Sequence, residues 1–255
     1  MSSKPATTGR SWWLPVLVVV AALAAIALLL WPTGDDSDAE EPAADISEEQ
    51  QGEAPPVEVV DPENYEDPEQ PDLTYVEGRD PEDPLAVGPA DAPVVLVVFS
   101  DYQCLYCAAW STETMPEMLD YVEAGDLRIE WRDLNVFGPA SVRASQAAYA
   151  AALQGSFWEF HEELFDGGEQ RPESELSEEA LISLAAELGL DTEQFTQDMN
   201  SPEVEEQVTA NQQLGTDLGV YSTPAFLLAG DPMVGAQPTE TFTDAVDEAL
   251  EAEQE

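Results

Sequence analysis

The sequence has few basic residues, and this scarcity excludes a large class of functions. Only 7 of its 255 residues are Lys or Arg, against 54 Asp or Glu, so its formal net charge at pH 7 is −47. Nucleic-acid binding needs clustered Lys and Arg against the phosphates, so the sequence predicts no nucleic-acid partner. The composition resembles that of proteins adapted to high salt, where screening tolerates dense surface carboxylates.

Cysteine and histidine are also scarce: the chain has two cysteines, Cys104 and Cys107, and one histidine, His161. Two cysteines three positions apart cannot join distant parts of a chain. They also fall short of the four Cys or His ligands that a structural zinc site usually takes, and His161 leaves the set one ligand short. We therefore expect no metal site, which leaves redox chemistry for the cysteine pair.

An uncharged apolar segment follows a short polar N-terminus. Residues 12–31 contain no charged side chain and have tryptophans at both ends, where interfacial aromatic rings prefer to lie. Twenty helical residues span about 30 Å, the thickness of the bilayer's hydrocarbon core. The alternative is a cleaved signal peptide, which usually has a shorter apolar core and small residues at the cleavage site. Because this run ends in Leu-Leu-Leu-Trp-Pro, we predict a retained transmembrane anchor at residues 12–31.

The charges on either side of the anchor predict its orientation. Residues 1–11 contain Lys4 and Arg10 and no acid, whereas acidic residues follow from Asp35 onward. The positive-inside rule therefore places residues 1–11 in the cytoplasm and the rest of the chain outside the cell membrane. Residues 32–83 are dense in Asp, Glu and Pro, which predicts a disordered, extended linker. The linker is either a spacer that holds the following domain away from the membrane or a solvated tail with no specific partner.

The composition changes after Pro84, and residues 84–255 are predicted to form an α/β layered domain with a helical insertion. The run 94–99 is β-branched and apolar, as expected for a strand buried on both faces. A helix should follow over 104–124, kinked where Pro116 interrupts it. Further strands are predicted at 127–134, 225–229 and 233–235, and helices at 140–153, 157–165, 178–188, 192–199, 203–218 and 239–251.

The sequence Cys104-Leu105-Tyr106-Cys107 opens the first predicted helix directly after the buried strand. Unpaired N–H groups and the helix dipole stabilise an anion there, so we expect the pKa of Cys104 to lie below the free-cysteine value of about 8.5. Cys107 lies about one turn away, within reach of a disulfide. The pair can therefore cycle between dithiol and disulfide, with Cys104 as the exposed attacking sulfur and Cys107 as the resolving thiol.

Several segments resemble the DsbA-like thioredoxin-fold proteins. The segment 99–107 is similar to that family's active-site stretch, and the resemblance extends over residues 84–252 through segments 132–141, 157–161 and 219–226. It implies a thioredoxin fold with a helical insertion and a thiol–disulfide oxidoreductase. It also implies that Thr223-Pro224 forms a cis-proline loop whose Thr223 backbone pairs with the substrate peptide. Leu105 stands where the family often has proline. Because the residues between the cysteines influence how well the thiolate is stabilised, the family's redox potential cannot be assumed for this chain.

Other residues near the motif invite interpretation. Asp101, Leu105 and Tyr106 are candidates for tuning the thiol pKa, although a carboxylate before a helix is usually a cap or solvated. His161 lies among aromatic residues and is expected to be structural rather than catalytic.

Motif, resemblance and predicted topology together indicate an extracytoplasmic dithiol oxidase that introduces disulfides into secreted or membrane proteins. It would need no metal or organic cofactor, but a separate redox partner would have to recycle the pair. A disulfide reductase or isomerase using the same two sulfurs is the alternative. A non-catalytic anchored module with a static disulfide is a further one.

Overall fold

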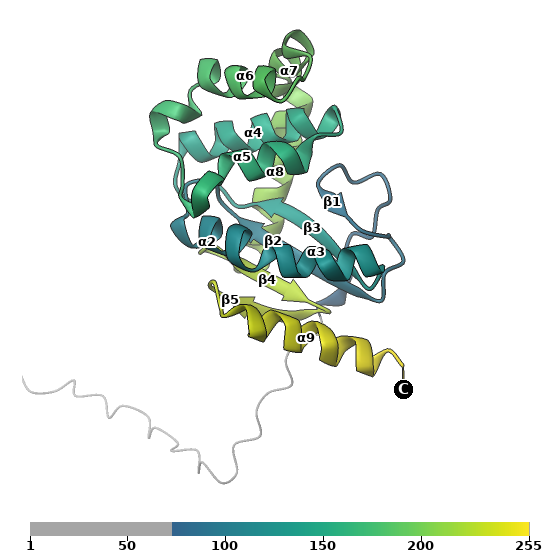
Figure 1. The fold of residues 1–255 in the computed structure, drawn as a ribbon. Helices are drawn as coiled ribbons and strands as arrows, with labels where there is room; N and C mark the ends of the chain where they lie inside the picture. The colour runs from purple at the N-terminus through teal and green to yellow at the C-terminus, as the bar shows by residue number, and fades with distance from the viewer. Residues whose placement is uncertain (1–72, 255) are drawn as a thin grey trace, which may run out of the picture. The chain divides into compact units, whose positions relative to one another are not determined.

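A mixed five-stranded sheet is the centre of the computed structural model, which describes residues 73–254 (Figure 1). Its strands lie in the order β1-β3-β2-β4-β5, and only β2 and β3 are parallel to each other. The central strand β2 is buried along its whole length, as its continuous apolar run predicts. The strands are β1 (Ala86–Val87), β2 (Val94–Ser100), β3 (Leu127–Asp133), β4 (Ala225–Leu228) and β5 (Asp231–Val234).

Helices follow the strands in the predicted order. Figure 1 shows α4 to α7 gathered at one end of the sheet and α9 near β4 and β5 at the other. The α-helices are α2 (Leu105–Glu113), α3 (Met115–Ala124), α4 (Pro139–Leu153), α5 (Phe157–Leu164), α6 (Glu178–Glu187), α7 (Thr192–Met199), α8 (Pro202–Asp217) and α9 (Thr239–Ala252). Short 3-10 helices are η1 (Thr74–Val76), η2 (Asp166–Gly168) and η3 (Glu173–Leu176). The thioredoxin-like α/β domain with a helical insertion is confirmed.

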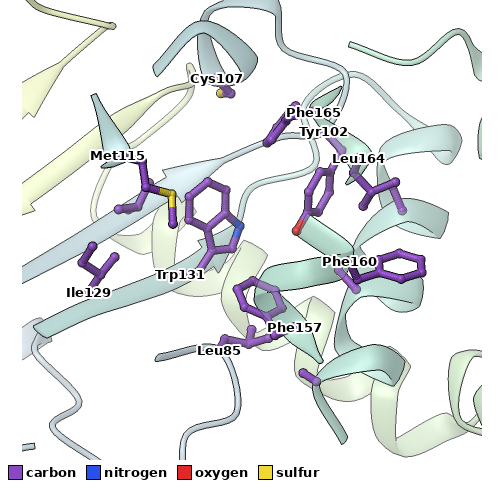
Figure 2. Packing of buried hydrophobic residues seen from close by; sticks show 14 of the residues in the cluster. Leu85, Tyr102, Cys107, Met115, Ile129, Trp131, Phe157, Phe160, Leu164 and Phe165 are labelled. Carbon is purple, nitrogen blue, oxygen red and sulfur yellow. The ribbon is translucent and has the colours of Figure 1, made fainter. Parts of the chain in front are cut away.

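The larger core lies on one face of the sheet, and Trp131 of β3 is at its centre. Figure 2 shows Trp131 between Met115 on one side and Tyr102 and Phe157 on the other, with Cys107 at the edge of the cluster. Leu96 and Val98 of β2 belong to the same core. Both redox cysteines, Cys104 and Cys107, belong to this core.

A smaller core covers the opposite face of the sheet, where Val95, Val97 and Phe99 point. Helix α8 approaches this face through Gly215, at which an added Cβ would lie only 2.8 Å from a Leu134 methyl carbon. Because no side chain intervenes, the helix can pack directly over the end of β3.

The segment 73–83 corrects the predicted linker, which was expected to be disordered through residue 83. Val76 is buried in the smaller core, and Leu73 packs against it. The Glu130 carboxylate accepts the N–H groups of Gly78 at 2.8 Å and Arg79 at 2.7 Å. Composition indicated disorder because the segment is acidic, but its backbone is held by a buried charge on β3.

Arginines connect separate parts of the chain. Arg128 donates to Glu130 at 2.8 Å and to the backbone carbonyls of Gly88 and Asp80. Arg132 pairs with Glu130 at 2.9 Å and with Asp83 at 2.8 Å, which ties the segment 73–83 to β3. Every arginine of residues 73–254 has such an internal partner, including Arg79, Arg143 and Arg171.

Two element boundaries differ from the prediction. The helix predicted over 104–124 is two helices meeting at Thr114, because Pro116 occupies the first turn of α3, where its missing N–H costs little. The last strand starts at Asp231, since Ala229 and Gly230 turn the chain with φ of 49° and 86°, as a two-residue hairpin requires.

The predicted cytoplasmic N-terminus at 1–11, the anchor at 12–31 and the linker from 32 to 72 lie outside the described residues. Among the helices within residues 73–254, none combines the length and the apolar character needed to cross a membrane.

Candidate active site

Cys104 lies where β2 gives way to α2. Its N–H donates to the Asp101 carbonyl at 3.0 Å, and its extended backbone (φ −96°, ψ 115°) makes it the N-cap of α2. The sulfur accepts the N–H of Cys107 at 3.3 Å. The strand, turn and helix start predicted from sequence therefore place this sulfur over the free N–H groups of α2.

These contacts lower the pKa of Cys104 from 9.0 to about 6. The largest cause is the hydrogen bond from the Cys107 thiol, followed by burial, which opposes the shift. The Thr223 hydroxyl, which has no other partner, and the N–H groups of Cys107 and Tyr106 lower the pKa further. At pH 7 Cys104 is therefore mainly a thiolate.

Cys104 was predicted to be the exposed sulfur, but it is only 2% exposed, so both cysteines are buried and the prediction of exposure is wrong. The pKa of Cys107 is shifted in the opposite direction. Only 1% of Cys107 is exposed, and burial raises the pKa of its thiol far above the ordinary value. The hydrogen bond to Cys104 raises it further, whereas Ser100 and the Asp101 N–H act in the other direction. Both cysteines are free thiols in this structure. The two buried sulfurs thus differ in their pKa: Cys104 is a reactive thiolate and Cys107 a protonated thiol.

The loop before β4 meets Cys104 from the other side. The peptide bond Thr223-Pro224 is cis, and the Thr223 carbonyl lies 3.3 Å from the Cys104 sulfur. The antiparallel pairing of β2 with β4 brings this loop to the site, since Phe99 and Ala225 are register partners. The predicted juxtaposition of Thr223 and Pro224 with the cysteines is therefore present.

Asp101 holds the turn that precedes Cys104. Its carboxylate is fully buried and accepts the N–H of Gln103 at 2.7 Å and that of Phe137 at 3.0 Å. The Gln103 amide in turn donates to the Arg171 carbonyl at 2.6 Å. Asp101 thus fastens the loop after β3 to the active-site turn. Its influence on the thiol pKa stays a prediction.

Apolar side chains are exposed on the elements that form the site. Leu105 and Tyr106 begin α2, Phe137 lies in the loop fastened by Asp101, and Tyr221 precedes the cis-proline. Each has more than half of its surface exposed. Leu105 and the Tyr106 ring therefore face solvent, and the contact of Tyr106 with Cys104 is through its backbone N–H.

His161 is structural, as predicted. It is 1% exposed, and its Nδ1 lies 3.2 Å from the Tyr102 hydroxyl. The rings of Trp131, Phe157 and Phe165 surround it, the Trp131 centroid being 4.3 Å away. Burial lowers its pKa to about 3, so it is neutral at physiological pH. Within residues 73–254, no three His, Cys, Asp or Glu side chains are grouped to hold a metal ion.

Sequence reasoning missed two buried polar residues behind the cysteines. Ser100 ends β2 and Asp133 ends β3, and the two are register partners in the parallel pair. Ser100 is 1% exposed and Asp133 is fully buried. The available signal was their position directly after apolar strand interiors, where a polar side chain needs a reason to be buried.

Comparisons with known proteins agree with this geometry. A family model described as thioredoxin matches residues 80–248. The chain is 28% identical over 152 residues to a probable disulfide bond formation protein D of Bacillus anthracis, covering 57% of this chain and 70% of that protein. It is 36% identical over 166 residues to a Na(+)/H(+) antiporter NhaA of Herminiimonas arsenicoxydans. That match covers 64% of this chain, which spans only about a quarter of the antiporter.

Two solved structures have the same architecture. A thioredoxin-like oxidoreductase from Silicibacter pomeroyi DSS-3 has 32% sequence identity and a TM-score of 0.58, over 70% of this chain and 97% of that chain. Oxidised BdbD from Bacillus subtilis has 23% identity and a TM-score of 0.60, over 66% of this chain and 92% of its own, which shows a shared fold.

Proposed function

The chain belongs to the thioredoxin family, and we propose that it is a thiol–disulfide oxidoreductase working mainly as a dithiol oxidase on cysteine-containing proteins outside the cytoplasm. The observation that carries the proposal is the asymmetry of its two sulfurs. Cys104 is a thiolate with a pKa of about 6, and Cys107 is a buried thiol. The relatives named for oxidoreductase activity and disulfide bond formation support the same reaction.

The geometry supports a two-step exchange. A substrate thiolate attacks Cys104 in the disulfide form, and the Cys104–Cys107 bond breaks with Cys107 as the leaving sulfur. A second substrate thiolate then attacks the substrate sulfur of the mixed disulfide and releases Cys104 as a stabilised thiolate. The substrate is oxidised by two electrons and the cysteine pair is reduced. A separate redox partner must then reoxidise the pair.

The direction of net exchange follows from how well the protein stabilises Cys104 as a thiolate. A stabilised thiolate is a good leaving group and favours the reduced pair, which makes the disulfide form oxidising. The net charge of −47 opposes an additional anion, but surface charges beyond about 10 Å are largely screened at 0.1 M salt. The hydrogen bonds at Cys104 are direct contacts, so the local stabilisation dominates.

A titration of the reduced domain tests the oxidase proposal. Thiolate absorbance should rise with a midpoint near pH 6, the pKa of Cys104, with no second rise from Cys107 below pH 9. Equilibration with glutathione should give a potential above the roughly −270 mV of thioredoxin. A midpoint near 9 with a potential close to −270 mV would instead favour the reductase or isomerase.

We propose further that residues 12–31 anchor the protein in the cell membrane with residues 1–11 in the cytoplasm. The support is the uncharged twenty-residue run with Lys4 and Arg10 before it and acids from Asp35 after it. Protease added to intact cells, or to spheroplasts where an outer barrier exists, should cut upstream of residue 73 and release a thiol-active fragment. Protection of the domain until the membrane is lysed would contradict this orientation.

A further inference from the structure

The sheet brings three segments side by side around Cys104. Strand β2 lies between β3 and β4 (Figure 1). β2 and β3 are parallel and end at the same edge of the sheet, at Ser100 and Asp133, and the antiparallel β4 starts at this edge. The turn that carries Cys104 therefore has the loop 134–138, which follows β3, on one side and the cis-proline loop on the other.

Hydrogen bonds attach the loop 134–138 to the helices behind it. The Asn135 N–H donates to the Gln212 side chain of α8 at 2.6 Å. The Asn135 side-chain oxygen accepts the Ser145 hydroxyl of α4 at 2.7 Å. Gly138, with a φ of 98° that glycine adopts readily, then leads into α4. The backbone of this loop is therefore held in one place.

Asp101 joins the same loop to the turn that carries Cys104. Its carboxylate is fully buried, Oδ1 accepts the Gln103 N–H at 2.7 Å, and Oδ2 accepts the Phe137 N–H at 3.0 Å. The Asp101 carbonyl accepts the Cys104 N–H at 3.0 Å. One residue thus fixes the backbones of Cys104 and Phe137 relative to each other.

The surface around Cys104 is uncharged, although the chain has 54 Asp or Glu. The segments 102–106, 134–138 and 219–224 contain no Asp, Glu, Lys or Arg. An acid there would repel an incoming substrate thiolate. These segments instead expose apolar side chains, which are Leu105, Tyr106, Val136, Phe137 and Tyr221. The surface is therefore suited to a cysteine that has apolar neighbours.

The burial of Cys104 makes those neighbours important. Because Cys104 is only 2% exposed, the sulfur of a partner protein reaches it when the chain on either side of the partner cysteine lies against the surrounding loops. Phe137 is 55% exposed and belongs to the loop that is bonded to the turn. Its ring can bury an apolar side chain of the partner, and such burial is favourable.

We propose that Phe137 is a specificity-determining residue that contacts an apolar side chain next to the partner cysteine, and that Asp101 positions it. This inference rests on the proposed function, because it concerns which cysteines that reaction accepts. Asp101 is a positioning residue, since its side chain is buried and acts through the backbone of Phe137. Phe137 itself is the residue that touches the substrate.

Oxidation of two reduced dithiol peptides by the oxidised full-length protein tests the contact. The peptides are neutral and differ only in whether leucines or serines flank one cysteine. Single-turnover rates with the peptide in excess give a half-saturating concentration and a limiting rate. The wild type should have a half-saturating concentration about fivefold lower for the leucine peptide. Phe137→Ala should remove this preference and change the limiting rate by less than about twofold.

Asp101→Asn tests the positioning role. The asparagine oxygen can still accept the Gln103 N–H, but its NH₂ group cannot accept the N–H of Phe137. The half-saturating concentration for the leucine peptide should therefore rise about fivefold, as with Phe137→Ala. The double variant should be no worse than either single variant, because both remove the same contact. A merely structural effect of Asp101→Asn would instead add to that of Phe137→Ala.

Three controls accompany these variants. Dithiothreitol, which has no flanking side chains, measures the reactivity of the disulfide itself in each protein. Leu153→Ala removes another exposed apolar side chain, about 20 Å away at the other end of α4, and should leave the peptide preference unchanged. In the wild type, the Phe137 amide proton should exchange with solvent at least about tenfold more slowly than a free amide, because Asp101 accepts it.

The outcomes are distinguishable. A wild type without preference between the peptides, or a Phe137→Ala protein that keeps the preference, would overturn the contact and leave the oxidoreductase proposal standing. Additive effects in the double variant, or a Phe137 amide that exchanges at the free rate, would overturn the positioning role of Asp101. A wild-type disulfide that oxidises neither peptide and resists dithiothreitol would overturn the proposed function itself.

Discussion

Cys107→Ala is expected to accumulate partner proteins on Cys104 as mixed disulfides, whereas Cys104→Ala should accumulate almost none. Cys104 carries the low pKa and lies beside the Thr223 carbonyl, where a partner's sulfur can arrive. Cys107 is buried beneath it and protonated. Without Cys107, internal release of the partner is lost, and adducts should persist until an external thiol is added.

Non-reducing gels of cells that express each variant measure this difference. Adducts should be abundant with Cys107→Ala, disappear with dithiothreitol, and fall to background with Cys104→Ala. Cys107→Ala loses the hydrogen bond from the Cys107 thiol, but the Thr223 hydroxyl and the backbone N–H groups of residues 106 and 107 still lower the pKa of Cys104. Burial keeps the thiol of Cys107 protonated, so the two variants should differ by at least about tenfold. Equal trapping by both would refute the division of roles between the sulfurs.

Glu130→Ala is expected to lower the free energy of unfolding by about 3–5 kcal/mol, because it leaves buried positive charges without their partner. The Glu130 carboxylate is fully buried and pairs with Arg128 and Arg132 while accepting the N–H groups of Gly78 and Arg79. Its removal breaks both the ion pairs and the attachment of the segment 73–83. Urea unfolding of the domain from residue 73 onward measures the loss.

An exposed glutamate on α6 provides the control for this measurement. Glu179→Ala should change stability by less than about 0.5 kcal/mol. Burial raises the pKa of Glu130, but its hydrogen bonds and ion pairs outweigh burial, so the net pKa is below 4.5. The stabilisation is therefore complete above pH 4.5 and is lost as the pH falls through the lowered pKa. A Glu130→Ala domain as stable as the control would show that the ion pairs are dispensable.

The redox motif could be predicted from sequence because its determinants are local. The apolar run of β2, the short turn and the start of α2 lie within fourteen residues, 94–107, and each has its own sequence signal. The position of Thr223 and Pro224 could not be derived this way. It depends on the pairing of Phe99 with Ala225, a long-range register that only the resemblance implied.

Glu130 was missed for a different reason. The alternation over 127–133 is typical of a strand with one polar face toward solvent. The structure buries that face because residues 78–83 fold back over it and supply backbone N–H groups and a carboxylate. Residues 78–83, which cover this face, lie about fifty residues upstream of β3, in a stretch whose composition indicates disorder. The sequence of neither segment therefore predicts its contact with the other.

The arginine contacts restrict how this sequence can change. Each arginine of residues 73–254 is an internal connector. Two join β3 to the segment 73–83 and to Gly88, and one joins that segment to the loop before β2. Of the other two, one joins α4 to η3 and one joins the loop after η2 to α5. Exchanging any of them for an acid would leave carbonyl or carboxylate oxygens facing a like charge. Many exposed neutral positions could become acidic without breaking a contact. Further substitution by Asp or Glu is therefore tolerated at exposed neutral positions but not at these few arginines.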